Sequence, residues 1–207
     1  MNKNDEIVFA LPVDDLFRGA TKFNGASFYS DPVILENIYT KSKPVKRRDC
    51  ENDPTMKHIV PYVVLTSANN KIFVTQRTSN QTEARLHGLH SVGVGGHVGP
   101  IGNYGVAESI VMGMLRELDE ELTGMKLPNF IAGIFKPNLM GYVNDDRNEV
   151  GAVHFGLIYN IFVHPTLAKG IKIKETDNMT GSWMPYKKAK KIENYESWSA
   201  YIMEGLN

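Results

Sequence analysis

The sequence predicts an α+β fold in which mixed β-sheets surround one helix that bears carboxylates. Three observations lead to this prediction. Runs rich in β-branched and aromatic residues, typical of strands, lie at 58–67, 71–77 and 150–163. An amphipathic helical pattern covers residues 106–122. A second helix is predicted from about residue 193 to residue 206, so strands dominate, with one central and one terminal helix.

Size, charge and cysteine content exclude several classes of protein. The 207 residues suit one domain of about 150 residues with extensions. With 23 basic and 23 acidic residues, the net charge is zero, which argues against a broad electrostatic grip on nucleic acid or on a membrane surface. The lone Cys50 excludes a disulfide framework and a cysteine-based zinc site. Without a signal-peptide pattern or an apolar run of roughly 18 residues, we expect a soluble, cytoplasmic protein.

The other predicted elements follow in chain order. Residues 6–11 predict a strand, residues 32–40 a short helix, and the charged segment 41–55, which contains two prolines, a surface connection. The runs 58–67 and 71–77 predict a hairpin around Ala68-Asn69-Asn70. A glycine-rich stretch precedes the central helix. Beyond that helix we expect a polar turn at 143–149, a short strand at 171–175 and a tryptophan-bearing turn at 181–185. Residues 1–55 are predicted to be an N-terminal extension packed on a core domain of residues 56–207.

The central helix has an acidic face in the sequence Arg116-Glu117-Leu118-Asp119-Glu120-Glu121. Glu117 lies three residues before Glu120 and four before Glu121, so the three carboxylates share one side of the helix. Like charges at this spacing repel one another unless a cation is bound. Hard oxygen ligands suit Mg²⁺ or Mn²⁺ better than zinc, and Arg116 can orient a neighbouring carboxylate. The alternative for an isolated acidic triplet is a solvated helix face.

Together with the glycine-rich loop, this helix resembles the Nudix box, Gly-x5-Glu-x7-Arg-Glu-U-x-Glu-Glu-x-Gly-U, in which U is aliphatic. The matching positions are Gly102, Glu108, Arg116, Glu117, Leu118, Glu120 and Glu121. Thr123 stands at the last box glycine, and Gly124 follows one place late. The Gly-Gly pair that usually opens the box lies early, at Gly95-Gly96, which makes Gly96 an alternative to Gly102. Flanking segments, among them RRDCENDPTMKHIVPYVV and NEVGAVHFGLIY, are similar to a branch called predicted MutT-like phosphoesterases.

The resemblance implies an α/β/α sandwich with a mixed sheet, and hydrolysis of a nucleoside diphosphate linked to another moiety, X. It implies that Glu117, Glu120 and Glu121, with the Gly96 carbonyl, bind Mg²⁺ or Mn²⁺. Water would attack phosphorus, so that catalysis consists of positioning and charge neutralisation. The general base is Glu120, Glu121 or a loop carboxylate, for which Glu149 is our candidate, ahead of Asp145 and Asp146.

Other residues are candidates for contacts with the substrate. Arg77 and Arg85 have guanidinium groups that match phosphate oxygens, although a surface role is open for each. His97 is a candidate substrate contact, because the spacing of His87, His90 and His97 is not that of a zinc site. His154, in a predicted buried strand, is expected to be a core histidine. Glu108 is expected to support the site through Arg116.

Two functions remain open at this stage. The first is a metal-dependent pyrophosphohydrolase, which the intact run from Arg116 to Glu121 favours. The second is a module of the same fold that senses a nucleotide or sugar phosphate without cleaving it. An isopentenyl diphosphate isomerase is disfavoured because Cys50 lies far from the glycine-rich stretch. We expect a small nucleotide or other diphosphate as the partner, no nucleic acid and no membrane. The sequence selects neither X nor between a monomer and a homodimer.

Overall fold

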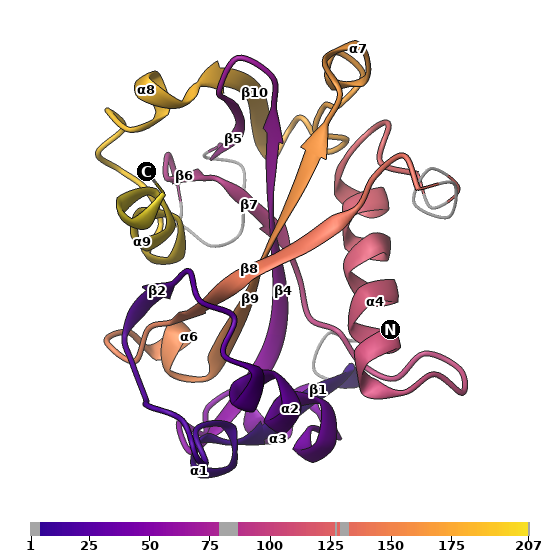
Figure 1. Ribbon diagram of the computed structural model, residues 1–207, viewed down its shortest axis with the longest axis vertical. Helices are drawn as coiled ribbons and strands as arrows, with labels where there is room; N and C mark the ends of the chain where they lie inside the picture. Colours follow the sequence, from indigo (N-terminus) through magenta and orange to yellow (C-terminus); the bar gives the residue numbers. More distant parts are fainter. Residues whose placement is uncertain (1–4, 79–86, 127, 129–132, 207) are drawn as a thin grey trace. The chain divides into compact units, whose positions relative to one another are not determined.

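The structure is a computed structural model that describes residues 5–78, 87–126, 128 and 133–206 (Figure 1). The strands belong to an open, mixed sheet accompanied by helices, which confirms the predicted fold class. The chain divides into two compact units. Unit 1 comprises Met1–Tyr62, Gly96–Met114 and Leu139–Ile158, and unit 2 comprises Val63–Gly95, Leu115–Asn138 and Tyr159–Asn207. The predicted boundary after residue 55 stays a prediction.

Three long elements run through both units: the strands β4 (Met56–Ser67) and β9 (His154–Val163), and the helix α4 (Val106–Glu121). β4 is buried along nearly its whole length, including Lys57 and His58 before its apolar run at 59–65, as in a strand covered on both faces. The apolar positions of α4 are buried too, Ile110 and Met114 in unit 1 and Leu118 in unit 2. Among the helices of the described residues, none combines the length and apolar character needed to span a bilayer.

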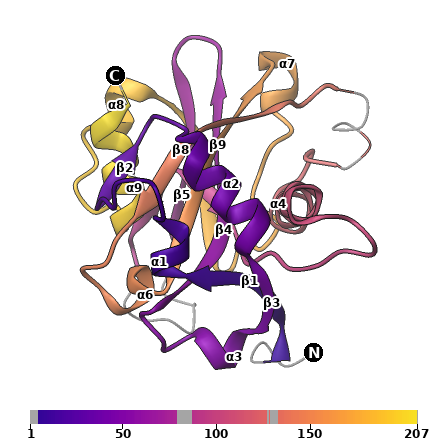
Figure 2. The ribbon, with the colours of Figure 1, turned by 60° about the horizontal axis from the view of Figure 1, so that its bottom comes forward.

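In unit 1 the first strand is part of the sheet. β1 (Ile7–Pro12) pairs antiparallel with β3 (Lys43–Lys46), beside which it lies in Figure 2, and with the start of β4. Ala10 of β1 stands opposite His58 of β4. β2 (Gly25–Ser27) pairs with β8 (Pro137–Asn144), which is the neighbour of β9. The helices of this unit are α1 (Val13–Leu16), α2 (Pro32–Lys41), α3 (Arg47–Cys50) and α6 (Glu149–Ala152).

In unit 2 the predicted hairpin is present. β5 (Lys71–Arg77) pairs with the end of β4, with Ser67 opposite Lys71. In the loop of residues 68–70, Asn69 and Asn70 have φ angles of 60° and 50°, in the left-handed region that asparagine tolerates. On its other side β5 pairs along its length with β10 (Met179–Pro185). The short strands β6 (His90–Ser91) and β7 (Gly93–Gly95) follow β5 in the chain. The helices are α7 (Pro165–Ala168), α8 (Tyr186–Ala189) and α9 (Ser197–Gly205).

Four sequence-based expectations about elements were wrong. The segment 41–55 is no mere connection, because β3 and α3 lie within it. The strand expected from residue 150 begins at residue 154, since the Asn148 side chain accepts a hydrogen bond from the Gly151 N–H and starts α6 there. The turn expected at 181–185 lies in β10, where Trp183 packs on Phe73 of β5 with ring centroids 5.3 Å apart. Residues 171–175 contribute an isolated bridge, Ile173 to Leu122, in place of a strand.

Candidate active site

The carboxylates of α4 lie at its C-terminal end, in unit 2. Arg116 Nη2 contacts Glu117 Oε1 at 2.6 Å, and Arg116 Nε lies 3.6 Å from Glu120 Oε1. The Glu117 side chain is 17% exposed and that of Glu120 63% exposed, so one carboxylate is shielded and the other open to solvent. Arg116 therefore orients two of the three predicted metal ligands, as its place in the sequence predicts.

Glu121 has the most perturbed carboxyl group of this cluster. Burial, followed by the negative charge of Glu117, raises its pKa to about 7, and Glu175 and Glu120 act in the same direction. The positive charge of Arg77 opposes this shift. The side chain of Glu121 is thus surrounded by like charges, and a cation bound there would relieve their repulsion.

Glu175 is a fourth carboxylate of the cluster that sequence reasoning missed. It follows the segment that returns to the end of α4, where Lys174 N–H donates to Glu121 O at 2.9 Å. The Lys174 ammonium bonds Asp119, which also pairs with Lys126 Nζ at 2.8 Å. Asp119 is therefore neutralised by two lysines, whereas Glu121 and Glu175 add negative charge next to each other. Nothing local in the sequence signals this proximity, because it depends on a long-range backbone contact.

Thr123, in place of the box glycine, holds the same returning segment. Its Oγ1 donates to Gly170 O at 2.6 Å and accepts from Lys172 N–H at 3.0 Å, while its own N–H donates to Lys172 O at 2.8 Å. Gly124 then supplies the left-handed conformation, with φ of 78°, in the turn that follows α4. The shifted glycine thus serves the turn, and the threonine adds contacts that a glycine lacks.

Of the two arginines predicted to contact the substrate, the structure describes Arg77 but not Arg85. Arg77 ends β5, opposite Met179 of β10, and its charge acts on Glu121, which brings it to the carboxylates. Arg85 lies outside the described residues.

The remaining predicted site residues belong to unit 1. Gly96 directly follows β7, and Glu108 is exposed in the first turn of α4. Glu149 is exposed at the first position of α6, after its cap Asn148. His97 Nε2 lies 2.9 Å from Nε2 of His154. The alternative first box glycine, Gly102, has φ of 52° in open space before α4.

The two alternative bases beside Glu149 are engaged elsewhere in unit 1. Asp145 is buried and accepts hydrogen bonds from Arg147 and Asn148. Asp146 pairs with Lys57 at 2.6 Å and with Lys22 at 2.9 Å. Both carboxylates therefore have structural partners, whereas the exposed Glu149 stays a candidate.

The donors on α4 fit a hard divalent cation by their chemistry, because Glu117, Glu120 and Glu121 offer oxygen atoms of the kind Mg²⁺ and Mn²⁺ prefer. In this structure Glu117 and Glu120 lie against Arg116. Within the described residues, three histidines of unit 1 form the group of ligating side chains whose ligand atoms all lie within 4.8 Å of one another. To bind a cation, Glu117 and Glu120 would therefore have to give up their contacts with Arg116.

Comparison with known proteins places this geometry in a family. No family model matches the chain. The crystal structure of Tm1382, a candidate Nudix hydrolase, superposes with a TM-score of 0.71 and 22% sequence identity, covering 96% of this chain and 97% of that one. The chain thus has the Nudix fold, and the residues that resemble the Nudix box lie on α4. Protein YmaB of Bacillus subtilis is 32% identical over 215 positions, which cover both chains completely. The chain therefore belongs to the family of YmaB.

Proposed function

We propose that the protein is a metal-dependent Nudix pyrophosphohydrolase that cleaves the diphosphate linkage of a nucleoside diphosphate–X substrate. The observation that carries the proposal is the environment of Glu121. Its carboxyl group lies near Glu117, Glu120 and Glu175, and its pKa is raised to about 7 by burial and by these neighbours. Such self-repulsion is costly in a structural helix end and useful in a cation site.

Each residue of the cluster has a proposed role. Glu117, Glu120 and Glu121 would hold Mg²⁺ or Mn²⁺, with the Gly96 carbonyl as a further ligand. When bound, the ion supplies charge neutralisation for the phosphates and a lowered pKa for the attacking water. Arg77, placed by the end of β5 near Glu121, binds a phosphate oxygen through its planar fork.

The chain's own groups then position and deprotonate the water. Arg116 holds Glu117 and Glu120 in place until phosphate and cation arrive. Glu149 is the proposed general base, with Glu120 and Glu121 as alternatives, and Glu108 is a proposed supporting carboxylate that acts through Arg116. A nucleotide-sized substrate with two or more phosphates suits this combination, because the carboxylates would hold the cation that neutralises the phosphates and the Arg77 guanidinium would bind a phosphate oxygen.

The test is hydrolysis of a broad panel: nucleoside triphosphates, ADP-ribose, sugar nucleotides, dinucleoside polyphosphates and non-nucleotide diphosphates, each with Mg²⁺ or Mn²⁺. Products are read by mass, because NMP plus pyrophosphate and NMP plus X-phosphate identify different cleavage positions. We expect turnover that chelation abolishes, and a loss of about 100-fold or more in kcat for Glu121→Gln. Glu204→Gln, on the exposed face of α9, is the charge-matched control and should retain full activity.

Unchanged turnover in Glu121→Gln would remove this carboxylate from the metal site. Saturable binding of one panel member, with no turnover under any metal, would instead favour the sensing module. A larger loss of turnover in Glu121→Gln than in Glu175→Gln would further distinguish a metal ligand from a carboxylate that only adds negative charge.

A further inference from the structure

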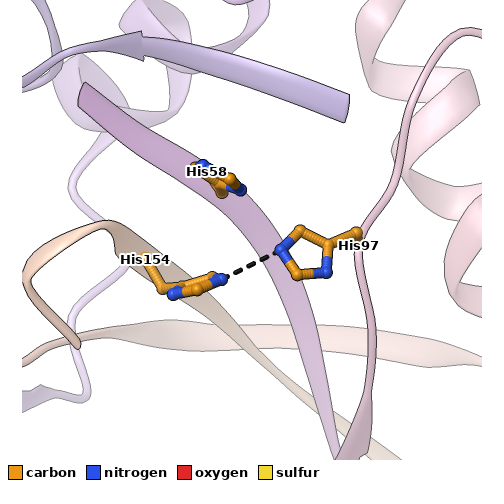
Figure 3. A group of neighbouring side chains, drawn as sticks. All are labelled: His58, His97 and His154. Carbon is orange, nitrogen blue, oxygen red and sulfur yellow. Dashed lines mark hydrogen bonds between the residues drawn. The ribbon is translucent and has the colours of Figure 1, made fainter. Parts of the chain in front are cut away.

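A second group of ligating side chains lies in unit 1. His58 comes from β4, His97 from the segment after β7, and His154 from the first position of β9 (Figure 3). One ring nitrogen of each histidine lies within 4.8 Å of one nitrogen of the other two. His97 Nε2 and His154 Nε2 are 2.9 Å apart, although they are 57 residues apart in sequence. Three segments of chain therefore converge on one point.

The least exposed member of this group has unsatisfied ring nitrogens. His58 is 0% exposed, and neither Nδ1 nor Nε2 makes a hydrogen bond of acceptable geometry. The Cys50 backbone is near enough to raise the pKa of His58, but burial outweighs it and leaves that pKa below its ordinary value. A buried polar group without a partner is costly, and native structures usually keep one for a reason. Figure 3 shows the three rings grouped together, with His58 beside the hydrogen-bonded pair.

The hydrogen bonds of His154 fix its chemistry as a ligand. Its Nδ1–H donates to Val150 O at 2.6 Å, which leaves Nε2 with a lone pair directed at His97. A hydrogen bond from the far nitrogen to a backbone carbonyl is the arrangement that orients metal-bound histidines in proteins. Burial also keeps both partners uncharged at neutral pH, since it lowers the pKa of His97 to about 2 and that of His154 to about 4.

The backbone holds all three residues in place before any ligand binds. His58 N–H donates to Val153 O at 2.7 Å, which ties β4 to the residue preceding His154. Phe9 N–H of β1 donates to Val98 O at 2.7 Å, which fixes the segment that contains His97. Gly99 permits this close approach, because a Cβ there would lie 2.0 Å from Ile7 O. The group is thus preorganised by strand pairing at His58 and His154 and by the backbone contact of β1 with the residue after His97.

One arginine and two carboxylates lie close enough to act on the histidine group. Arg47 is the positive group that acts on all three histidines. Its guanidinium is paired with Glu51 at 2.6 Å and with Glu6 at 3.5 Å. Arg47 lowers the pKa of each histidine, whereas Glu51 acts in the opposite direction on His58 and His154, and Glu6 does so on His58.

We propose that His58, His97 and His154 form a binding site for a divalent transition-metal ion, in the first place Zn²⁺, in addition to the carboxylate cluster on α4. Imidazole nitrogen suits Zn²⁺ and not Mg²⁺, and three histidines are one of the ligand sets that zinc uses with a fourth, open position. His97 is the most exposed of the three. Such an ion ties β4, the segment after β7 and β9 together within unit 1.

The test uses the full chain without an affinity tag, titrated with Co²⁺ in the presence of excess Mg²⁺. Mg²⁺ occupies oxygen sites and leaves the histidines free, and Co²⁺ with few nitrogen ligands gives an intense visible band that octahedral oxygen sites lack. We expect one equivalent of Co²⁺ to produce this band, and Zn²⁺ to displace it. His97→Ala should weaken Co²⁺ binding at least about tenfold. The matched control His164→Ala removes an exposed histidine and should bind normally.

The outcomes separate the proposal from its alternatives. Absence of the intense band in folded wild-type protein at saturating Co²⁺ would overturn the site, and so would an unchanged band in His97→Ala. A band lost equally in His164→Ala would indicate adventitious histidine binding and would also overturn it. If His97→Ala does not fold by circular dichroism, His97→Gln replaces it, because a polar side chain of similar size suits this partly exposed position. Glu121→Gln should keep the band, so that this result stands whether or not the proposed hydrolase activity is found.

Discussion

The carboxylates of unit 2 and the histidines of unit 1 are two groups of potential metal ligands that are built in opposite ways. Glu117, Glu120 and Glu121 are neighbours on one helix, and their cluster is completed by Glu175. The histidines come from three separate elements and meet through strand pairing. The first group can therefore be recognised from neighbouring residues in the sequence, whereas the second forms only when the chain folds.

The two groups also differ in how solvent and charge act on them. Burial pushes the pKa of Glu121 up to about 7, towards the neutral acid, and that of His154 down to about 4, towards the neutral base. A cation therefore relieves repulsion among the carboxylates, whereas it supplies a missing partner to the histidines. Changes in one unit should accordingly leave the other group intact, and the following variants test that independence.

The largest effect is expected from Asp146→Ala, next to the histidine group. Lys57, which precedes His58, is fully buried, with Nζ 2.6 Å from Asp146 Oδ1 and 2.8 Å from Gly151 O. Loss of the carboxylate leaves a buried ammonium with a carbonyl as partner and should cost about 3 kcal/mol in the free energy of unfolding, measured in urea. The control is Asp14→Ala, an exposed position in the same unit. It should cost only a few tenths of about 1 kcal/mol in the free energy of unfolding.

The same pair gives a pH dependence of defined sign. Burial alone would raise the pKa of Asp146, but hydrogen bonds from Lys57 and Lys22 bring it below its ordinary value. A carboxyl group with a depressed pKa stabilises the fold fully above its unfolded-state pKa of roughly 3.9, and this contribution is lost as the pH falls through the folded-state value. Wild-type stability should therefore fall more steeply below about pH 4 than that of Asp146→Asn. Parallel curves for the two proteins would contradict the pairing.

A smaller effect, of opposite sign, is expected from His58→Leu. Because both ring nitrogens of His58 are buried without partners, an apolar side chain of similar size should raise the stability of metal-free protein by about 1 kcal/mol. Stabilisation by added Zn²⁺ should disappear in the same variant. His90→Leu is the matched control, because His90 Nδ1 lies 3.0 Å from Asn194 Oδ1 and its loss should not stabilise. A less stable His58→Leu would show that His58 has a hydrogen-bond partner in solution.

The sequence predicted the local features of this molecule well. The periodicity of α4, its acidic face and the Asn69-Asn70 turn are all decided by residues within a few positions of one another, so they could be recognised directly. β10 could not be, because Gly181 and Trp183 read as turn residues until pairing with β5 supplies their partners. The same holds for β3, which is a charged segment by sequence and a strand only through β1.

The candidate site divides along the same line. Arg116 and the three glutamates follow from one motif, and the proximity of Arg77 was expected from its place at a strand end. Glu175 and His58 were missed, because each reaches its group through contacts between segments far apart in the chain. The roles assigned to all of these residues, and to Gly96, Glu108 and Glu149, stay predictions, to be tested by the same hydrolysis panel.

The smallest effect concerns Thr123→Gly, which restores the glycine of the Nudix box and should nevertheless harm the protein. Glycine removes the hydrogen bonds of Thr123 Oγ1 to the segment 170–172, which are exposed to solvent, and adds backbone freedom, for a loss of about 0.5 kcal/mol in the free energy of unfolding. Because that segment continues to Glu175, turnover should fall several-fold, while the Co²⁺ band of the histidine group stays unchanged. Thr123→Ser keeps the hydroxyl and should recover both stability and turnover. If Thr123→Gly proves as active and stable as wild type, the returning segment is held to α4 by its backbone pairing with residues 121–123, and the threonine is a neutral departure from the motif.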